Sequence, residues 1–476
     1  MRQALPSVVL LFVSSTALAQ PGAATAPSAV PSPPPNLLTI PPPPPVSDPM
    51  LAPVPPPTRM VASWSEALAY LRARSTDLRV AVDQVLQAEA QTRIALAQYL
   101  PTITASGLYT HQFITKQSTL PPGAQMSLQS AGLTVVNRIP TPDAESANVQ
   151  LQQNVINVQQ FDQISIDELG EDAAKLSVED EKRTLLLSLA NQIVSVVTAE
   201  RSAELNRVGL RVALEQLEIT NRKRGLGAAN GLDVVRAQQN AANARATLVT
   251  GDETLREARE SLGLALGIPE EAGVAQDINI DGMAESAMAS CRVVKSVDER
   301  ADVASALVKL DVAKRNLRNV YYQFLPTISA QSTVSAVNPV SSGQPNPLWN
   351  IQGVLSIPLW DGGNRYGELR SARAAQDIAA QQLEALRRSA VIQVEQAQRQ
   401  LLVAQQSAKV ALEQRDLAAQ NDQMTQTAYT VGQGTSLELV TASEAHRQAE
   451  LNLALQEFNV VKTRILAMVA LATCPW

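Results

Sequence analysis

One helix-to-strand junction occurs twice in this sequence, and the duplication constrains the fold more than any other feature. Residues 98–105 read QYLPTITA, and residues 323–330 read QFLPTISA. In both copies an alternating segment, a long proline-free stretch and a glycine-rich break follow the junction. We therefore expect two copies of one structural unit, the first at residues 63–280 and the second at residues 281–476.

The pattern predicts the same order of elements in each copy: helix, strand, strand, long helix, turn and returning helix. The separation from the second strand to the glycine break is 70 residues in the first copy (157 to 227) and 71 in the second (361 to 432). The expected elements of the first copy are helix 63–99, strands 102–110 and 148–155, and helices 161–224 and 232–266. Those of the second are helix 298–324, strands 327–337 and 349–359, and helices 364–430 and 437–471.

The first 19 residues read as a secretory signal peptide. Arg2 supplies the positive charge, residues 5–13 the apolar run, and Ala17-Leu18-Ala19 the small-residue cleavage site. The apolar run is too short to span a bilayer as a helix, which argues against a membrane anchor. No cysteine lies near the cleavage site, so a lipid-anchored N-terminus is not expected.

Residues 20–62 are expected to form a disordered tether. The segment 21–58 holds 16 of the 29 prolines, a composition that disfavours both helices and sheet ladders. A spacer is the simplest role for it, and contact with peptidoglycan or with a neighbouring protein is the alternative.

The four predicted strands are two-faced. In the first strand Ile103, Ala105, Gly107 and Tyr109 alternate with Thr102, Thr104, Ser106 and Thr110. After the signal peptide no run of 18 apolar residues occurs, so the mature chain is secreted, periplasmic or an outer-membrane barrel. Four strands cannot close a barrel alone, and an open edge facing lipid leaves backbone groups unsatisfied. Several chains must therefore complete the wall, and three chains of four strands would supply twelve.

The long second-copy helix carries the seam of a coiled coil. Its apolar residues follow mostly three-and-four spacing, and several are alanine: Leu369, Ala372, Ala379, Leu383, Leu386, Ala390, Val394, Ala397, Leu401, Ala404 and Ala408. Further apolar residues such as Ile378, Val403, Val410 and Leu417 widen the seam toward both flanks, as a ring of helices requires. An ordinary antiparallel coiled-coil stalk is the alternative, but it leaves the two-faced strands unexplained.

Composition excludes several functions. The net charge is −6 and no basic cluster occurs, so nucleic acid is not an expected partner. No nucleophile motif, P-loop or dinucleotide fingerprint is found, and His111 and His446 are isolated. Cys291 and Cys474 are too few and too far apart for a metal site, although two thiols often pair in an oxidising compartment. We expect no enzyme activity, no catalytic residue, no metal and no cofactor.

Taken together, the motifs resemble the TolC-like outer-membrane efflux family over residues 63–472. The residues that carry the resemblance are the junctions Leu100-Pro101-Thr102 and Leu325-Pro326-Thr327, the segment IPLWDGG at 357–363, and the segments YTVG at 429–432 and LELVTA at 437–442. The resemblance implies a mixed α and β fold: a twelve-stranded membrane β-barrel of a homotrimer, continuous with a long periplasmic α-helical barrel. It also implies that the protein is the exit duct of a tripartite efflux pump or a type I secretion system. The duct would lie in the cell outer membrane, in contact with outer-membrane lipid. The partners would be a periplasmic adaptor protein and an inner-membrane pump.

The same resemblance assigns roles to residues near the two glycine breaks. Asp233 and Glu438 would form rings of carboxylates at the periplasmic mouth, although each could instead only favour its helix dipole. Tyr429 would link to Asp233 and hold the mouth shut, while Gly434 replaces an arginine partner and Thr441 a second acidic residue. Adaptor docking would involve two turns, Leu226-Gly227 and Val431-Gly432.

The resemblance places Cys291 and Cys474 in the equatorial belt of the family. A disulfide there is one expectation, and two free buried thiols are the other. A soluble periplasmic coiled-coil adaptor or structural stalk remains the alternative function; it predicts extraction without detergent. The cargo depends on the pump and is not encoded in this chain.

Overall fold

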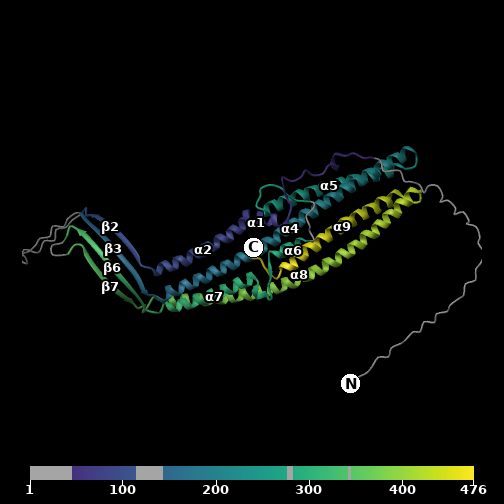
Figure 1. The fold of residues 1–476 in the computed structure, drawn as a ribbon. Helices are drawn as coiled ribbons and strands as arrows, with labels where there is room; N and C mark the ends of the chain where they lie inside the picture. Colours follow the sequence, from purple (N-terminus) through teal and green to yellow (C-terminus); the bar gives the residue numbers. More distant parts are fainter. Residues whose placement is uncertain (1–44, 114–142, 276–281, 341–344) are drawn as a thin grey trace, which may run out of the picture. The chain divides into compact units, whose positions relative to one another are not determined.

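The computed structural model describes residues 45–113, 143–275, 282–340 and 345–476. The signal peptide expected at residues 1–19, the tether before residue 45 and most of the polar stretch between the first two strands lie outside these ranges. The long helices in Figure 1 are α4 (Val158–Gly225), α5 (Gly231–Ala265), α8 (Asn364–Thr430) and α9 (Ser436–Val469). Their bounds agree with the predicted helices to within a few residues.

The remaining elements are shorter. The helices are α1 (Trp64–Arg74), α2 (Thr76–Tyr99), α6 (Met283–Ala289) and α7 (Ala301–Tyr322), with 3-10 turns η1 (Pro49–Leu51) and η2 (Val297–Glu299). The strands are β1 (Arg59–Val61), β2 (Thr102–His111), β3 (Asp143–Ile156), β4 (Ala272–Val274), β5 (Arg292–Val293), β6 (Thr327–Asn338), β7 (Leu348–Ser356) and β8 (Ala472–Thr473). Among the helices that the structure describes, none is both long and apolar enough to cross a membrane.

The first predicted helix is wrong in one respect, because it is broken at Ser75. This residue has extended ψ (φ −57°, ψ 123°), and its hydroxyl accepts a hydrogen bond from the backbone N–H of Leu78 at 3.2 Å. Ser75 therefore ends α1 and caps α2. A serine inside an otherwise periodic segment can compete for backbone groups in this way, and the periodicity alone concealed it.

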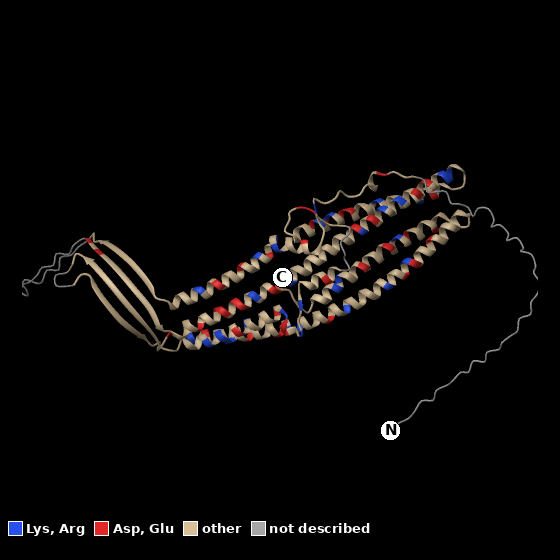
Figure 2. Cartoon of the chain, viewed as in Figure 1, with Lys and Arg blue, Asp and Glu red and all other residues tan. Residues whose placement is uncertain are grey.

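Strands β2, β3, β6 and β7 form one antiparallel sheet in the order β2-β3-β6-β7. Directly paired residues share a face. One such row across the sheet is Ala105, Val149, Val334 and Trp349, and the next row on the opposite face is Thr104, Gln150, Thr333 and Asn350. The predicted alternation is therefore confirmed. Figure 2 shows that these four strands carry few charged residues. Asp143 and Glu145, both on β3, are the only Lys, Arg, Asp or Glu residues within the four strands.

The helices pack along α4, which contacts α2, α5, α7 and α9, while α8 contacts α7 and α9. The buried face of α8 repeats every seven residues at Leu383, Ala390, Ala397, Ala404 and Ala411. A strict seven-residue spacing is the seam of a coiled coil, and alanine lets neighbouring backbones approach closely. The predicted seam is confirmed on this side of the helix.

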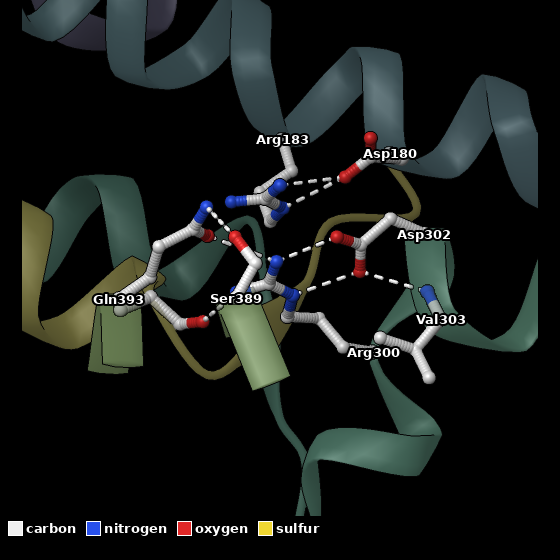
Figure 3. A network of polar contacts seen from close by, with 8 residues as sticks. Asp180, Arg183, Arg300, Asp302, Val303, Ser389 and Gln393 are labelled. Carbon is white, nitrogen blue, oxygen red and sulfur yellow. Dashed lines mark hydrogen bonds and ion pairs between the residues drawn. The ribbon is translucent and has the colours of Figure 1, made fainter. Parts of the chain in front are cut away.

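A buried arginine lies where α4, α7, α8 and the C-terminal segment meet (Figure 3). Arg300 is 1 % exposed; it donates to Asp302 at 2.5 and 2.8 Å and to the side-chain oxygen of Gln393 at 3.0 Å. Arg183 from α4 lies beside this pair and is itself held by Asp180. Burial opposes ionisation of Asp302, but the Arg300 hydrogen bonds and charge outweigh it and lower the pKa of Asp302. The network therefore holds its charges in pairs, as a buried site requires.

The prediction of a disordered tether over residues 20–62 is wrong for residues 45–61. Residues 45–61, here called the strap, pack on the α4–α5 hairpin and end in β1, which pairs in parallel with β4. The backbone N–H of Ala275 also donates to the carbonyl of Val61 at 2.9 Å. Proline disfavours helix and central strand, but it does not prevent an extended segment from packing on helices.

Candidate functional site at the two helical turns

The first turn connects α4 to α5. Gly227 adopts φ +73°, a left-handed conformation that glycine accepts without steric cost. The backbone N–H of Leu226 bonds back to the carbonyl of Arg222 at 3.1 Å, which closes α4. Asn230 then caps α5 and forms a capping box with Asp233, in which each side chain accepts from the other residue's backbone N–H.

The second turn connects α8 to α9 and is built in the same way. Gly432 adopts φ +80°. Thr435 caps α9, and Glu438 accepts from the Thr435 backbone N–H at 2.8 Å and from its hydroxyl at 2.9 Å. Both acids predicted to form rings therefore have a local role as partners in capping boxes. These hydrogen bonds lower the pKa of Glu438, so it stays a carboxylate to lower pH than a free glutamate.

Asp233 also joins the two turns. The hydroxyl of Ser436, at the start of α9, donates a hydrogen bond to the Asp233 carboxylate. This hydrogen bond is the main reason why the pKa of Asp233 is lowered. The Asn230 backbone N–H and the charge of Arg236 lower it further. The donor that reaches Asp233 from the second hairpin is thus Ser436, a residue that the sequence did not single out.

Tyr429 contacts Lys223, and among the described residues it makes no direct hydrogen bond to Asp233, the partner expected from the sequence. The Lys223 ammonium lies 3.7 Å from the centre of the Tyr429 ring, a cation–π contact between the last turns of α4 and α8. Burial lowers the pKa of Lys223. Burial also raises the pKa of Tyr429, and the nearby charge of Asp233 raises it further. Asp233, Tyr429, Ser436 and Lys223 therefore form one cluster, whereas Glu438 remains in its own capping box.

Large apolar side chains are exposed at both turns. Leu226 is 85 % exposed and Val431 58 %, and they occupy matching positions one residue before the left-handed glycines. Leu232 and Leu437, which follow the two turns, are also exposed. Each turn therefore presents two large apolar side chains to solvent, at matching positions in the two hairpins.

Cys291, directly before β5, and Cys474, directly after β8, lie away from the turns and form a disulfide. Next to it β5 pairs with β8, so the C-terminal segment is held by both covalent and backbone bonds. The centre of the Trp476 ring lies 5.3 Å from the Arg72 guanidinium carbon and 6.0 Å from the Lys182 ammonium nitrogen. These contacts fix the end of the chain onto α1 and α4.

Comparison with known proteins agrees with this architecture. The model of the outer membrane efflux protein family matches residues 67–268 and 293–466. Nodulation protein T of Rhizobium leguminosarum bv. trifolii is 22 % identical over 408 residues, covering 81 % of this chain and 80 % of that protein. Outer membrane protein TolC of Escherichia coli (strain K12) is 23 % identical over 350 residues, covering 70 % of each chain.

Among solved structures, that of CusC superposes with a TM-score of 0.73, covering 88 % of this chain and 96 % of that chain. Its sequence identity is 17 %, so this likeness supports the fold alone. The family match covers most of the chain and confirms the resemblance drawn from the duplicated junctions. The chain belongs to the outer membrane efflux protein family.

Proposed function

We propose that this protein is the exit duct of a tripartite efflux pump or a type I secretion system, and that it works as a homotrimer in the outer membrane. Substrates would enter from an inner-membrane pump and leave at the cell exterior. The chain itself would act as a conduit and not as an enzyme, without cofactor or metal. The observation that carries the proposal is the two-faced, four-stranded sheet, whose outer strands β2 and β7 each have one strand neighbour among the described residues.

The faces of the sheet fit a wall between lipid and water. Exposed apolar side chains gather on one face, among them Ile103, Trp349 and Ile351, each more than 65 % exposed. The opposite face carries a row of polar residues: Thr102, Gln152, Gln331 and Gln352. In a barrel the first face would meet lipid and the second would line an aqueous lumen.

The edges β2 and β7 must be satisfied by another chain, because lipid offers no hydrogen-bond partner for their backbone groups. Pairing β7 of one subunit with β2 of the next is a head-to-tail contact, which closes into a ring when the rotation permits. Three subunits of four strands give a twelve-stranded barrel, wide enough to leave a lumen open.

The helices offer matching edges. On α8 an apolar stripe remains exposed beside the buried seam: Ile378, Leu402, Val403, Val410 and Leu417. On α2 a second set remains exposed: Val80, Val82, Leu86 and Ile94. Covering these stripes with a neighbouring subunit would close the helices into an α-barrel, as the flanking apolar residues of the seam predict.

At the turns, threefold symmetry would repeat Asp233 and Glu438 as two rings of carboxylates that attract cations. The contacts of Asp233 with Ser436, and of Lys223 with Tyr429, would hold the two hairpins of a subunit together and keep the mouth narrow. The exposed residues at Leu226-Gly227 and Val431-Gly432 would contact the periplasmic adaptor.

The domain organisation follows the same plan. Residues 1–19 would be removed as a signal peptide, and residues 63–280 and 281–476 would be two copies of one repeat. The family match supports this division, because it falls in two segments separated by residues 269–292.

Membrane fractionation and planar-bilayer recording test the function together. The protein should sediment with outer membranes, require detergent for extraction and form cation-preferring channels. Asp233→Asn together with Glu438→Gln should weaken the cation preference, because the carboxylates that attract cations are gone. A protein released in aqueous buffer, or one without conductance, would contradict the proposal.

A further inference from the structure

The strap (residues 45–61) follows the α4–α5 hairpin as a mostly extended chain, interrupted by the 3-10 turn η1. Asp48 accepts from Arg245 at 2.9 Å, and the carbonyl of Pro55 accepts from Arg259 at 2.9 Å. The two strap residues are 7 positions apart and their partners on α5 are 14 apart. Along the strap, three residues form η1 at about 2.0 Å each and four are extended at about 3.1 Å each, which gives about 18 Å; along α5 the 14 residues span about 21 Å, so the two separations are comparable. The strap therefore runs beside α5 in the same direction, with Pro45 on the side of the Gly227 turn.

Apolar side chains of the strap seal the seam between the two helices. Val46, Met50 and Leu51 pack against a cluster that is half alanine: Leu210, Ala213, Leu214, Ala241, Ala244 and Leu248. Alanine buries little apolar area, so two helices that meet through alanine gain little from each other. The strap supplies the apolar area that this part of the hairpin lacks.

Asp48 is the polar centre of the contact. Its side chain is 10 % exposed and accepts from the Met50 backbone N–H at 2.9 Å in addition to Arg245. The Met50 hydrogen bond, followed by that from Arg245, lowers the pKa of Asp48, so it stays charged and paired.

We propose that the strap is a clamp that holds α5 against α4 about 21 Å along the hairpin from the start of α5, and so limits the movement of the Leu226-Gly227 turn when this turn meets its partner. The proposal rests on the adaptor docking proposed above, but the clamp itself is tested without an adaptor. In Asp48→Ala, backbone amides of α5 within residues 231–250 should exchange with deuterium about threefold to tenfold faster than in the wild type. Exchange in the four-stranded sheet should not change.

Two variants make the comparison specific. Arg245→Ala should raise exchange in the same amides but by less than Asp48→Ala, because the Met50 backbone N–H keeps its acceptor in that variant. The double variant should add nothing to Asp48→Ala, which already removes both contacts. Glu253→Ala is the matched control: it breaks an exposed ion pair with Arg256 on the same helix and should leave exchange unchanged. Unchanged exchange in Asp48→Ala, or an equal rise throughout α8 and α9, would overturn the clamp.

The position of the turn is measured separately. Both cysteines are engaged in the disulfide, so Leu226→Cys provides a single exposed thiol for a spin label. The distribution of label-to-label distances in the purified trimer should be narrow in the wild-type background and broader with Asp48→Ala. Equal widths would overturn the positioning role. Failure of adaptor docking would change neither result, so the two proposals fail separately.

Discussion

Ser436 is the residue that ties the two helical turns together, because its hydroxyl donates to Asp233 while its backbone begins α9. Lys223 makes the second contact between the hairpins through the Tyr429 ring. Neither contact could be read from the sequence, since the partners lie 203 and 206 positions apart and Ser436 and Lys223 each look like ordinary helix-end residues. The local geometry of each turn was more predictable, because glycine and a capping residue determine it.

Replacing Ser436 with alanine should weaken the contact that we propose keeps the periplasmic mouth narrow. A hydrogen bond from the buried Ser436 hydroxyl to a carboxylate contributes about 1.5 kcal/mol, which corresponds to about a tenfold change in an equilibrium. Single-channel recordings of Ser436→Ala should show open probability raised by about that factor. Ser443→Ala, about two turns further along α9, is the control and should behave as the wild type. Indistinguishable recordings from both variants would remove Ser436 from the gate.

The proposed cation preference of the channel should persist when the pH is lowered into the mildly acidic range. The pKa values of Asp233 and Glu438 are lowered, so both groups stay ionised above their usual values of about 3.9 and 4.3 and lose charge only as the pH falls through the lower folded values. Their stabilising contribution to the capping boxes has the same sign: it is present above the unfolded pKa values and is lost on acidification below them. Reversal potentials should therefore stay constant from pH 7 down to about pH 4.5. Loss of selectivity near pH 6 would contradict this assignment.

At the scale of elements, the long helices and the sheet were predictable because their signals are local and repeat many times. The buried residues of α8 follow a seven-residue period, and the strands alternate with a period of two. The break at Ser75 and the pairing of Arg59 with Ala272 were not predictable. Both depend on competition or contact that a periodic pattern does not contain, and the short strands β1, β4, β5 and β8 join segments far apart in the chain.

The two faces of the sheet should differ in their tolerance of charge. Val149 lies on the apolar face near the middle of β3, and Gln150 lies on the opposite face. An arginine facing lipid at the middle of the bilayer costs about 2–4 kcal/mol, whereas the lumen is polar. Val149→Arg should reduce the amount of heat-resistant trimer in outer membranes, and Gln150→Arg should leave it nearly unchanged. Equal effects would mean that the faces are assigned wrongly.

At the scale of the whole molecule, the disulfide ties together the second half of the chain. Cys291 and Cys474 are 183 residues apart, so the bond restricts a long loop in the unfolded state. Cys291→Ser with Cys474→Ser should lower the free energy of unfolding by about 2–5 kcal/mol. Thermal unfolding in detergent should occur at lower temperature, while conductance stays the same because the turns are unaltered. A conductance that changes with the thermal midpoint would show that the disulfide also influences the mouth.

Everything proposed for the channel depends on subunits supplying one another's missing strand partners. Native mass spectrometry of protein extracted from outer membranes in mild detergent tests this most directly. The account predicts one dominant species with the mass of three mature chains, together with loss of that species when β2 or β7 carries a proline that blocks edge pairing. A single chain as the dominant species, stable and detergent-free in buffer, would contradict it.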